Sequence, residues 1–177
     1  MEGILQAASE ILVTEGYSGL TTNRIAEIAG VSIGSLYQYF PNKTAIAIEL
    51  VRRKRSNLSA GIAEALEGEH ERSFEETLRR LVDATITHQL QWPRLAHALD
   101  QAQAFLPLQA ETMALNARMV RTVGAFLARA GKPSGTTTVR DLIAIVRGMV
   151  ETAGLAGETD RHDLSARVMR AASGYLG

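Results

Sequence analysis

The sequence predicts an all-α protein of about nine helices, and three observations carry this prediction. Apolar residues recur at intervals of three and four along nearly the whole chain of 177 residues, which is the pattern of helices with one buried face. No segment shows the strict alternation of apolar and polar residues that a half-buried strand needs. Gly, Pro, Ser and Asn stand between the periodic segments, where helices end and begin.

Composition narrows the class of protein. Hydrophobic residues make up 46% of the chain, and 19 basic residues balance 19 acidic ones, so the net charge is +0. This balance argues against a coat protein that binds nucleic acid non-specifically through counterion release. The chain has no cysteine, no basic-then-apolar leader and no apolar run of the roughly 18 residues that a transmembrane helix needs. We therefore expect a cytoplasmic protein that does not enter a membrane.

The first predicted helix carries an apolar stripe from Ile4 to Leu12 and ends near Gly16, a residue suited to a positive φ. Thr22 to Ala29 reads as a second, short amphipathic helix that a threonine caps at its start.

A third helix follows after only three residues. Gly30 stops the second helix, and Ser32 caps a segment in which Ile33, Leu36 and Phe40 share one face. Two short helices joined by a Gly-containing turn form a helix-turn-helix, which places its second helix in a DNA major groove.

The residues of this segment resemble, in order and spacing, the DNA-binding signature of the tetracycline-repressor (TetR) family of transcription regulators. The resemblance covers roughly the first quarter of the chain. It implies an N-terminal three-helix helix-turn-helix domain followed by a helical ligand-binding and dimerisation domain, which we place at residues 1–46 and 47–177. The matching residues are Leu20, Thr21, Thr22, Ile25, Ala26, Ala29, Gly30, Val31, Ser32, Gly34, Leu36, Tyr37, Tyr39, Phe40 and Lys43.

The predicted DNA contacts follow from the geometry of a recognition helix, whose N-terminal residues reach the base edges. We expect Tyr37 and Lys43 to hold phosphates, and Ile33 to meet a thymine methyl group. The residues assigned to the DNA site are Thr22, Asn23, Ser32, Ile33, Gly34, Ser35, Tyr37, Gln38, Tyr39 and Lys43.

A fourth, long helix is predicted to start at Asn42 and contains the basic run from Arg52 to Arg55. Four consecutive helical residues spread around all faces, so we interpret the run as a solvated face rather than a phosphate site. Pro93 and Pro107 end the fifth and sixth helices, and the segment from Gly131 to Thr138 reads as a loop.

The last two predicted helices span about Val139 to Leu155 and Asp163 to Leu176. Their apolar residues cover more surface than one intramolecular face buries, so we expect them to pair with their own copies in a four-helix, two-fold symmetric interface. The residues assigned to this interface are Leu142, Val146, Met149, Val150, Leu164, Val168, Ala172 and Tyr175.

Polar residues on otherwise apolar helical faces leave two interpretations open. Such groups form ordinary hydrogen bonds in a core, or they anchor a bound molecule. Together with the resemblance, they predict a mostly apolar pocket walled by the fifth to seventh helices. The residues assigned to it are His88, Gln89, Trp92, Leu95, His97, Leu99, Gln101, Phe105, Met113, Asn116 and Val120.

Two catalytic or metal-binding patterns compete with this interpretation. Gly30 to Gly34 matches G-x-S-x-G, but a nucleophile elbow needs a strand before its serine and the preceding segment is helical, so Ser32 is assigned as a helix cap. The four histidines lack the spacing of a zinc site. We expect no enzyme activity, no metal and no cofactor.

The resulting prediction is a sequence-specific DNA-binding regulator. In the favoured form it is a homodimeric repressor that a small, largely apolar ligand releases from its double-stranded operator. The alternative is a helix-turn-helix regulator that a partner protein controls, with no pocket for a small molecule.

Overall fold

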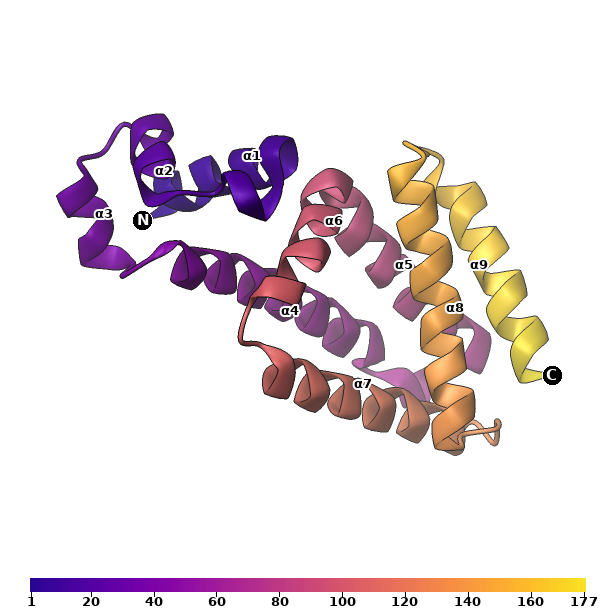
Figure 1. Ribbon diagram of the computed structural model, residues 1–177. Helices are drawn as coiled ribbons and strands as arrows, with labels where there is room; N and C mark the ends of the chain where they lie inside the picture. The colour runs from indigo at the N-terminus through magenta and orange to yellow at the C-terminus, as the bar shows by residue number, and fades with distance from the viewer. The chain divides into compact units, whose positions relative to one another are not determined.

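The computed structural model of the protein describes all residues 1–177 and is all-helical, as predicted. Nine α-helices and two short 3₁₀ helices follow one another along the chain (Figure 1). The first four are α1 (Glu2–Gly19), α2 (Thr22–Ala29), α3 (Ile33–Tyr39) and α4 (Lys43–Leu66). The others are η1 (Glu69–Glu71), α5 (Phe74–Gln91), α6 (Pro93–Ala102), η2 (Gln103–Phe105), α7 (Gln109–Arg129), α8 (Thr136–Leu155) and α9 (Arg161–Leu176).

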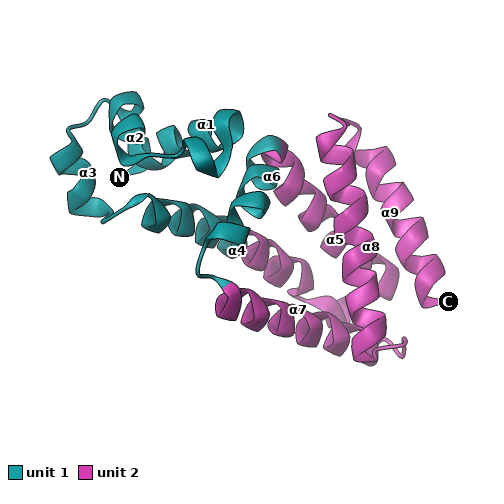
Figure 2. Cartoon of the chain, in the orientation of Figure 1, with its two compact units in different colours: residues 1–56, 94–108 teal, residues 57–93, 109–177 magenta.

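The helices form two compact units, shown in different colours in Figure 2. Unit 1 consists of residues 1–56 and 94–108, and unit 2 consists of residues 57–93 and 109–177. Unit 1 therefore contains α6 in addition to the helix-turn-helix. The functional boundary between residues 46 and 47 stays a prediction, since compactness alone does not define a functional domain.

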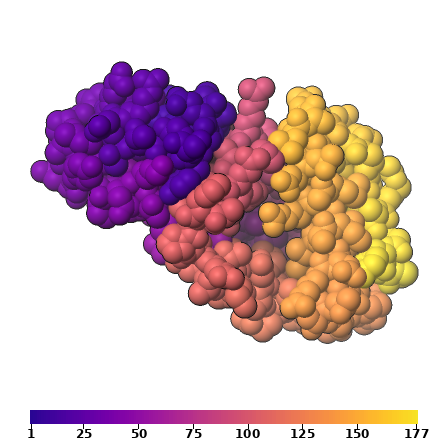
Figure 3. All heavy atoms as spheres, in the orientation of Figure 1, coloured from indigo at the N-terminus to yellow at the C-terminus, as the bar shows by residue number.

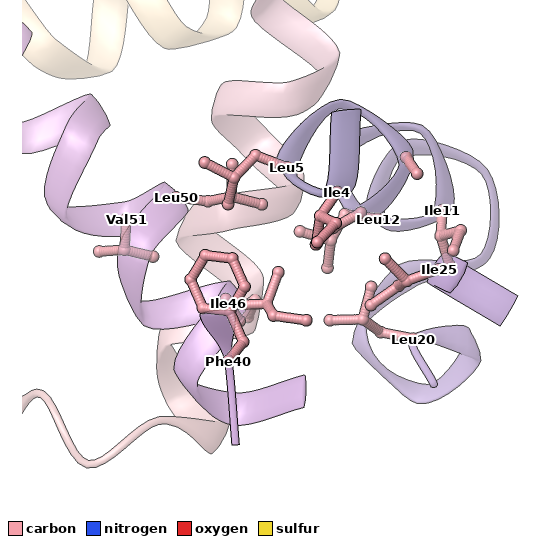
Figure 4. Packing of buried hydrophobic residues seen from close by; sticks show 14 of the residues in the cluster. Ile4, Leu5, Ile11, Leu12, Leu20, Ile25, Phe40, Ile46, Leu50 and Val51 are labelled. Carbon is pink, nitrogen blue, oxygen red and sulfur yellow. The ribbon is translucent and has the colours of Figure 1, made fainter. Parts of the chain in front are cut away.

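The core of unit 1 holds the helix-turn-helix in place. Ile4 and Leu12 of α1 pack with Ile25 of α2, Leu36 of α3 and Ile46 of α4 in one buried cluster. Figure 4 shows Ile4, Leu12, Ile25 and Ile46 pointing into this cluster from the surrounding helices. Burial of one face of each short helix fixes the direction in which the opposite face points.

A glycine breaks α1 where the sequence predicts an end. Gly16 has φ 68° and ψ −171° inside the segment Glu2–Gly19, a conformation outside the helical region. Residues with a Cβ rarely adopt a positive φ of this kind. The apolar stripe thus ends at Gly16, and the chain is redirected toward α2.

Residues of the basic run of α4 form ion pairs with carboxylates of unit 1. Arg53 binds the carboxylates of Glu49 and Glu2, each at 2.9 Å. Lys54 donates to Asp100 Oδ2 at 2.8 Å, and its side chain is only 16% exposed. The interpretation of this run as a solvated face is therefore wrong for Lys54, because α6 supplies a carboxylate that the local sequence does not reveal.

Unit 2 is built around α5, α8 and α9, which pack against one another, with α7 packed on α8. Its α8 starts at Thr136, so the predicted loop from Gly131 to Thr138 is too long by three residues. Gly154 of α8 is buried, and a Cβ there would lie 3.0 Å from Leu90 Cδ2 and 3.2 Å from Pro93 Cβ. No helix of the protein combines the length and the apolar character needed to span a membrane.

Candidate nucleic-acid interface

The turn between α2 and α3 is set by local hydrogen bonds. Thr21 Oγ1 accepts from the Arg24 N–H at 3.2 Å and caps α2. Gly30 ends the helix with φ 64° and ψ 32°, in the left-handed region that favours glycine. The Val31 N–H then donates to the Ala26 carbonyl at 3.0 Å. The predicted stop at Gly30 is thus present in the backbone.

Ser32 caps the start of α3, the second helix of the motif. Its Oγ accepts from the Ser35 N–H at 3.0 Å and lies 2.8 Å from Ser35 Oγ. The residue follows helix α2 and a turn, so it occupies a helix cap and not the strand-to-helix position of a nucleophile elbow.

One face of α3 is buried and the other is open to solvent. Leu36 and the following Phe40 are buried in the core of unit 1. Outside these buried positions, the exposed fractions are 39% for Ile33, 51% for Tyr37 and 56% for Tyr39, so Ile33 does not share the burial of Leu36 and Phe40 that its spacing predicts. Apolar and aromatic side chains at such exposure mark a binding surface when they cluster on one short helix.

The remaining predicted contact residues lie on α2, on α3 and at the cap of α3. Asn23, Ser32, Gly34 and Gln38 are exposed, while Thr22 and Ser35 are half-buried. A Cβ built on Gly34 would meet only Ser32 Oγ, at 3.8 Å. The space over Gly34 is therefore open to a close approach by a ligand backbone.

A hydroxyl pair links the two helices of the motif. Thr22 Oγ1, at the start of α2, lies 3.3 Å from the Tyr37 Oη of α3. The pair brings two hydroxyl groups to one exposed position beside the first turn of α2. Hydroxyls and helix N-termini are common donors to DNA phosphates.

Lys43 lies deeper than a simple phosphate contact requires. The side chain is half-buried, its Nζ donates to the Tyr17 carbonyl at 3.4 Å, and it lies 4.7 Å from the centre of the Tyr17 ring. Tyr17 is held in turn by Thr44, at 3.1 Å, and by stacking on Phe105. An ammonium group has three donors, so Lys43 keeps capacity for a further acceptor.

Two exposed apolar residues of the motif were missed by the sequence analysis. Ile28 and Val31 are each more than a third exposed. Ile28 stands three residues after Ile25 and next to Ala29, so helical periodicity places it beside the apolar stripe and gives no signal that it faces outward.

The predicted ligand residues are divided between the two units. Leu99 lies in the core of unit 1, and the Phe105 ring stacks on Tyr17. Gln101 Nε2 lies 2.9 Å from His97 Nε2, within hydrogen-bond distance, and Leu95 packs against the core. The residues in unit 2 are His88, Gln89, Trp92, Met113, Asn116 and Val120.

The unit 2 members of this set differ in exposure. Trp92, Met113 and Asn116 are exposed. His88, Gln89 and Val120 are half-buried, and Val120 packs against the unit's core. The assignment of all eleven positions to one pocket stays a prediction.

The predicted interface residues divide by burial within unit 2. Val146 and Met149 are half-buried, and Tyr175 is exposed. Tyr175 Oη donates to Asp141 at 2.8 Å, and this bond raises the pKa of Tyr175. The residues placed in the chain's own core are Leu142, Val150, Leu164, Val168 and Ala172.

These five buried side chains stabilise unit 2 itself and are not available to a second copy. The reason is that α5 and the α8–α9 contact cover the apolar stripes that the sequence analysis left without an intramolecular partner. A dimer interface on α8 and α9 stays a prediction. Such an interface would have to form through the outer faces of the two helices.

The fold and the motif are those of helix-turn-helix proteins, a class that binds DNA. Residues 4–50 match the family described as "Bacterial regulatory proteins, tetR family", and residues 73–176 match the family described as "Tetracyclin repressor-like, C-terminal domain". The second match alone covers more than half of the chain. The chain belongs to the tetR family.

Characterised relatives are similar over one segment each. The HTH-type transcriptional activator FasR of Mycolicibacterium smegmatis is 40% identical over 63 residues, which are 36% of this chain and 29% of FasR. The Fatty acid metabolism regulator protein of Bacillus subtilis is 41% identical over 51 residues, 29% of this chain and 26% of that protein. The chain thus spans about a third or less of the length of these relatives.

Solved structures share the whole fold. The regulator PfmR from Thermus thermophilus has a TM-score of 0.77 at 20% identity, with 98% of this chain and 96% of that chain covered. A tetR family protein from Rhodococcus RHA1 has a TM-score of 0.84 at 18% identity, with 99% and 96% covered. The fatty acid degradation regulator FadR from Bacillus halodurans has a TM-score of 0.67 at 17% identity, with 99% and 94% covered.

Proposed function

We propose that this tetR family regulator is a homodimeric repressor, and that a small, largely apolar ligand releases it from its operator. The observation that carries the DNA part is the open face of α3, where Ile33, Tyr37 and Tyr39 are exposed beside the first turn of α2. Each subunit would place this face in one major groove.

On this proposal, contacts divide into those that position the protein and those that read bases. The hydroxyls of Thr22 and Tyr37, 3.3 Å apart, would bind one phosphate together. Gln38 would read a base edge, since an amide pairs in a bidentate manner with adenine. Ile33 would pack on a thymine methyl group, and the open space over Gly34 would admit the DNA backbone.

Lys43 would act on phosphate from a fixed position. Its bond to the Tyr17 carbonyl and its place over the Tyr17 ring restrain the side chain. A restrained cation loses less conformational entropy on binding than a free surface lysine. Its substitution would flatten the salt dependence of binding by about one unit.

The dimer would form through the outer faces of α8 and α9. The two helices pack side by side, and parts of both lie at the surface of the single chain seen in Figure 3 (orange and yellow). On α8 the exposed positions Ala144, Gly148 and Thr152 recur every four residues, so one face is lined by small side chains. Such a face permits close approach of a second helix, and two-fold symmetry would then pair two recognition helices on one operator.

Ligand control rests on the family and on named relatives. Two similar proteins are a fatty acid metabolism regulator and a fatty acid degradation regulator, which supports an apolar effector for this chain. The helix α4 runs from Lys43 to Leu66, and it contributes residues to both compact units. A ligand that favours one dimer geometry would use this helix as its lever, since a ligand shifts only equilibria in which its affinities differ.

Selection of bound sequences from random double-stranded DNA tests the proposal. A homodimer should enrich an inverted repeat whose half-sites lie about one helical turn, or a multiple of it, apart. If the selection enriches no sequence, sequence-specific binding is refuted. If it enriches a single site without a repeat, the symmetric dimer is refuted.

The effector is tested on the selected operator with palmitate as the apolar probe and octyl glucoside, below its micelle concentration, as a control for detergent effects. Typical allosteric coupling of about 1 to 3 kcal/mol would lower operator affinity about 5- to 150-fold. If palmitate leaves affinity unchanged, a fatty acid effector is refuted, and control by a partner protein becomes the better account.

A further inference from the structure

A cavity of about 300 Å³ lies within unit 2, and none of the residues predicted for the ligand pocket lines it. It is lined by the segment that precedes α5, by the first turn of α5 and by the C-terminal end of α7. The rings of Phe74 and Phe126, which both line the cavity, stack with centres 5.3 Å apart and planes 13° apart. One part of the wall is therefore flat and apolar.

The lining also contains a buried hydroxyl that has no hydrogen-bond partner. Thr77 is 1% exposed, and its Oγ1 makes no hydrogen bond. A helical threonine usually donates to the carbonyl four residues earlier, as Thr85 does to Leu81 at 2.9 Å. The Ser73 carbonyl, which is the equivalent acceptor for Thr77, accepts only the Thr77 N–H, at 3.1 Å.

Two charged residues of the same lining each have one buried atom without a hydrogen-bond partner. Glu69 forms an ion pair with Arg129 through Oε1, while its Oε2 is shielded and has no partner. Arg72 donates through Nη2 to the carbonyls of Ala65 and Glu67, while its Nε is shielded and has no partner. The carboxylate oxygen needs a donor and the guanidinium N–H needs an acceptor.

Buried polar groups are almost always paired, and three residues that line one cavity each carry a shielded polar atom without a partner, which is an unusual concentration. Glu69 Oε2 complements a cation, Arg72 Nε complements an anion, and the Thr77 hydroxyl serves either group. Bonds between ionised partners are stronger than neutral ones, so a molecule with both charges fits better than a neutral amide. The two stacked phenylalanines add an apolar surface on which a flat ring can pack.

We propose that this cavity binds a small zwitterion with a flat apolar body, such as an aromatic α-amino acid. Its ammonium group binds Glu69, its carboxylate binds Arg72, and its ring lies along Phe74 and Phe126. The site goes beyond the proposed regulation of DNA binding, because the occupant need not be the molecule that releases the operator.

Isothermal titration calorimetry of the full chain, without DNA, tests this site with L-phenylalanine as the probe. We expect saturable binding. Three matched compounds each lack one feature: 3-phenylpropionate has no ammonium, phenethylamine has no carboxylate and glycine has no ring. Each should bind at least about tenfold more weakly, since one charge-assisted bond or one buried ring is worth that much. Benzamide, which is neutral, should also be weaker.

Variants tie the binding to this cavity. Thr77→Val keeps the side-chain shape and should weaken L-phenylalanine about five- to tenfold. Thr85→Val, on the same helix but outside the cavity lining, is the matched control and should bind normally. Glu69→Gln lies before α5, so it tests the ammonium contact even if Thr77→Val unfolds the helix.

Absence of saturable binding by L-phenylalanine would overturn the proposal, as would equal binding of benzamide or unchanged affinity in both Thr77→Val and Glu69→Gln. None of these results would bear on sequence-specific DNA binding, which the selection experiment measures separately.

Discussion

Lys54 Nζ of α4 and Asp100 Oδ2 of α6 lie 2.8 Å apart, with side chains that are only 16% and 19% exposed. Lys54 also donates to the Ala96 carbonyl at 2.9 Å, and Gln103 donates to Asp100 Oδ1 at 2.9 Å. Arg55 of α4 reaches Gln103 Oε1 at 2.6 Å. Two neighbouring residues of α4 thus hold α6 and η2 within unit 1.

Asp100→Ala should destabilise the protein by about 1.5 to 3 kcal/mol, because it leaves a shielded ammonium with one fewer acceptor. Urea unfolding, followed by circular dichroism, measures the loss. The double variant Lys54→Met with Asp100→Leu should recover most of it, since no unpaired charge then remains.

The control for this pair is Arg79→Ala, which removes an exposed ion pair with Glu75 at 3.5 Å and should change stability by less than about 0.5 kcal/mol. A double-mutant cycle with no coupling between Lys54 and Asp100 would show that the contact contributes nothing to stability.

Gly154→Ala should destabilise the protein by about 1 to 2 kcal/mol, although alanine favours helices. The added Cβ would lie 3.0 Å from Leu90 Cδ2 and 3.2 Å from the rigid ring of Pro93. Gly61→Ala is the matched control, because its Cβ would meet only Ala84 Cβ at 3.6 Å. That control should gain about 0.5 to 1 kcal/mol. Thermal unfolding of both variants would contradict the packing argument if their shifts had the same sign.

Gln38→Ala should relax preference at one base position of the selected operator, with a loss of about 1 to 3 kcal/mol there. Tyr37→Phe should instead weaken every sequence alike, by about 1 kcal/mol or about fivefold, since it removes a hydroxyl assigned to phosphate. Fluorescence anisotropy on the operator and its single-base variants distinguishes the two patterns. Uniform weakening by Gln38→Ala would remove that residue from base reading.

Gly148→Arg should convert the dimer to monomers and weaken operator binding. Apart from its chain neighbours and the nearby backbone of α8 itself, nothing lies within 4 Å of a Cβ at Gly148, so the fold itself should tolerate the change. In the proposed interface, the same side chain would bring an unpaired charge between two helices. Sedimentation velocity measures the oligomeric state, and Thr87→Arg, at an exposed position on α5, is the control. A dimeric Gly148→Arg protein would move the interface away from this face of α8.

The parts of the fold that depend on neighbouring residues could be predicted from sequence. The stop at Gly30 and the caps at Ser32 and Asn42 were all predicted and are all present. Each is decided by groups within a few positions along the chain, so a single sequence contains the necessary information.

Features that depend on distant residues were not predictable in the same way. Periodicity shows that Leu142 and Val168 are apolar on one face, but it does not show whether α5 or a second copy covers that face. The place of α6 in unit 1 depends on the pairing of Lys54 with Asp100, 46 residues apart. Thr77 carried no local signal, because only tertiary packing decides that its hydroxyl is buried without a partner.

The caps of the DNA-reading segment also bear on the order of folding. Thr21, Ser32 and Asn42 each accept from the N–H three residues later, at 3.2, 3.0 and 2.9 Å. Contacts of such short range close within about a microsecond, far sooner than long-range pairings form. In pulse-labelled amide exchange during refolding, we therefore expect α2 and α3 to gain protection before α6. The helix-turn-helix would thus form its turns before the long-range contacts of the chain are made.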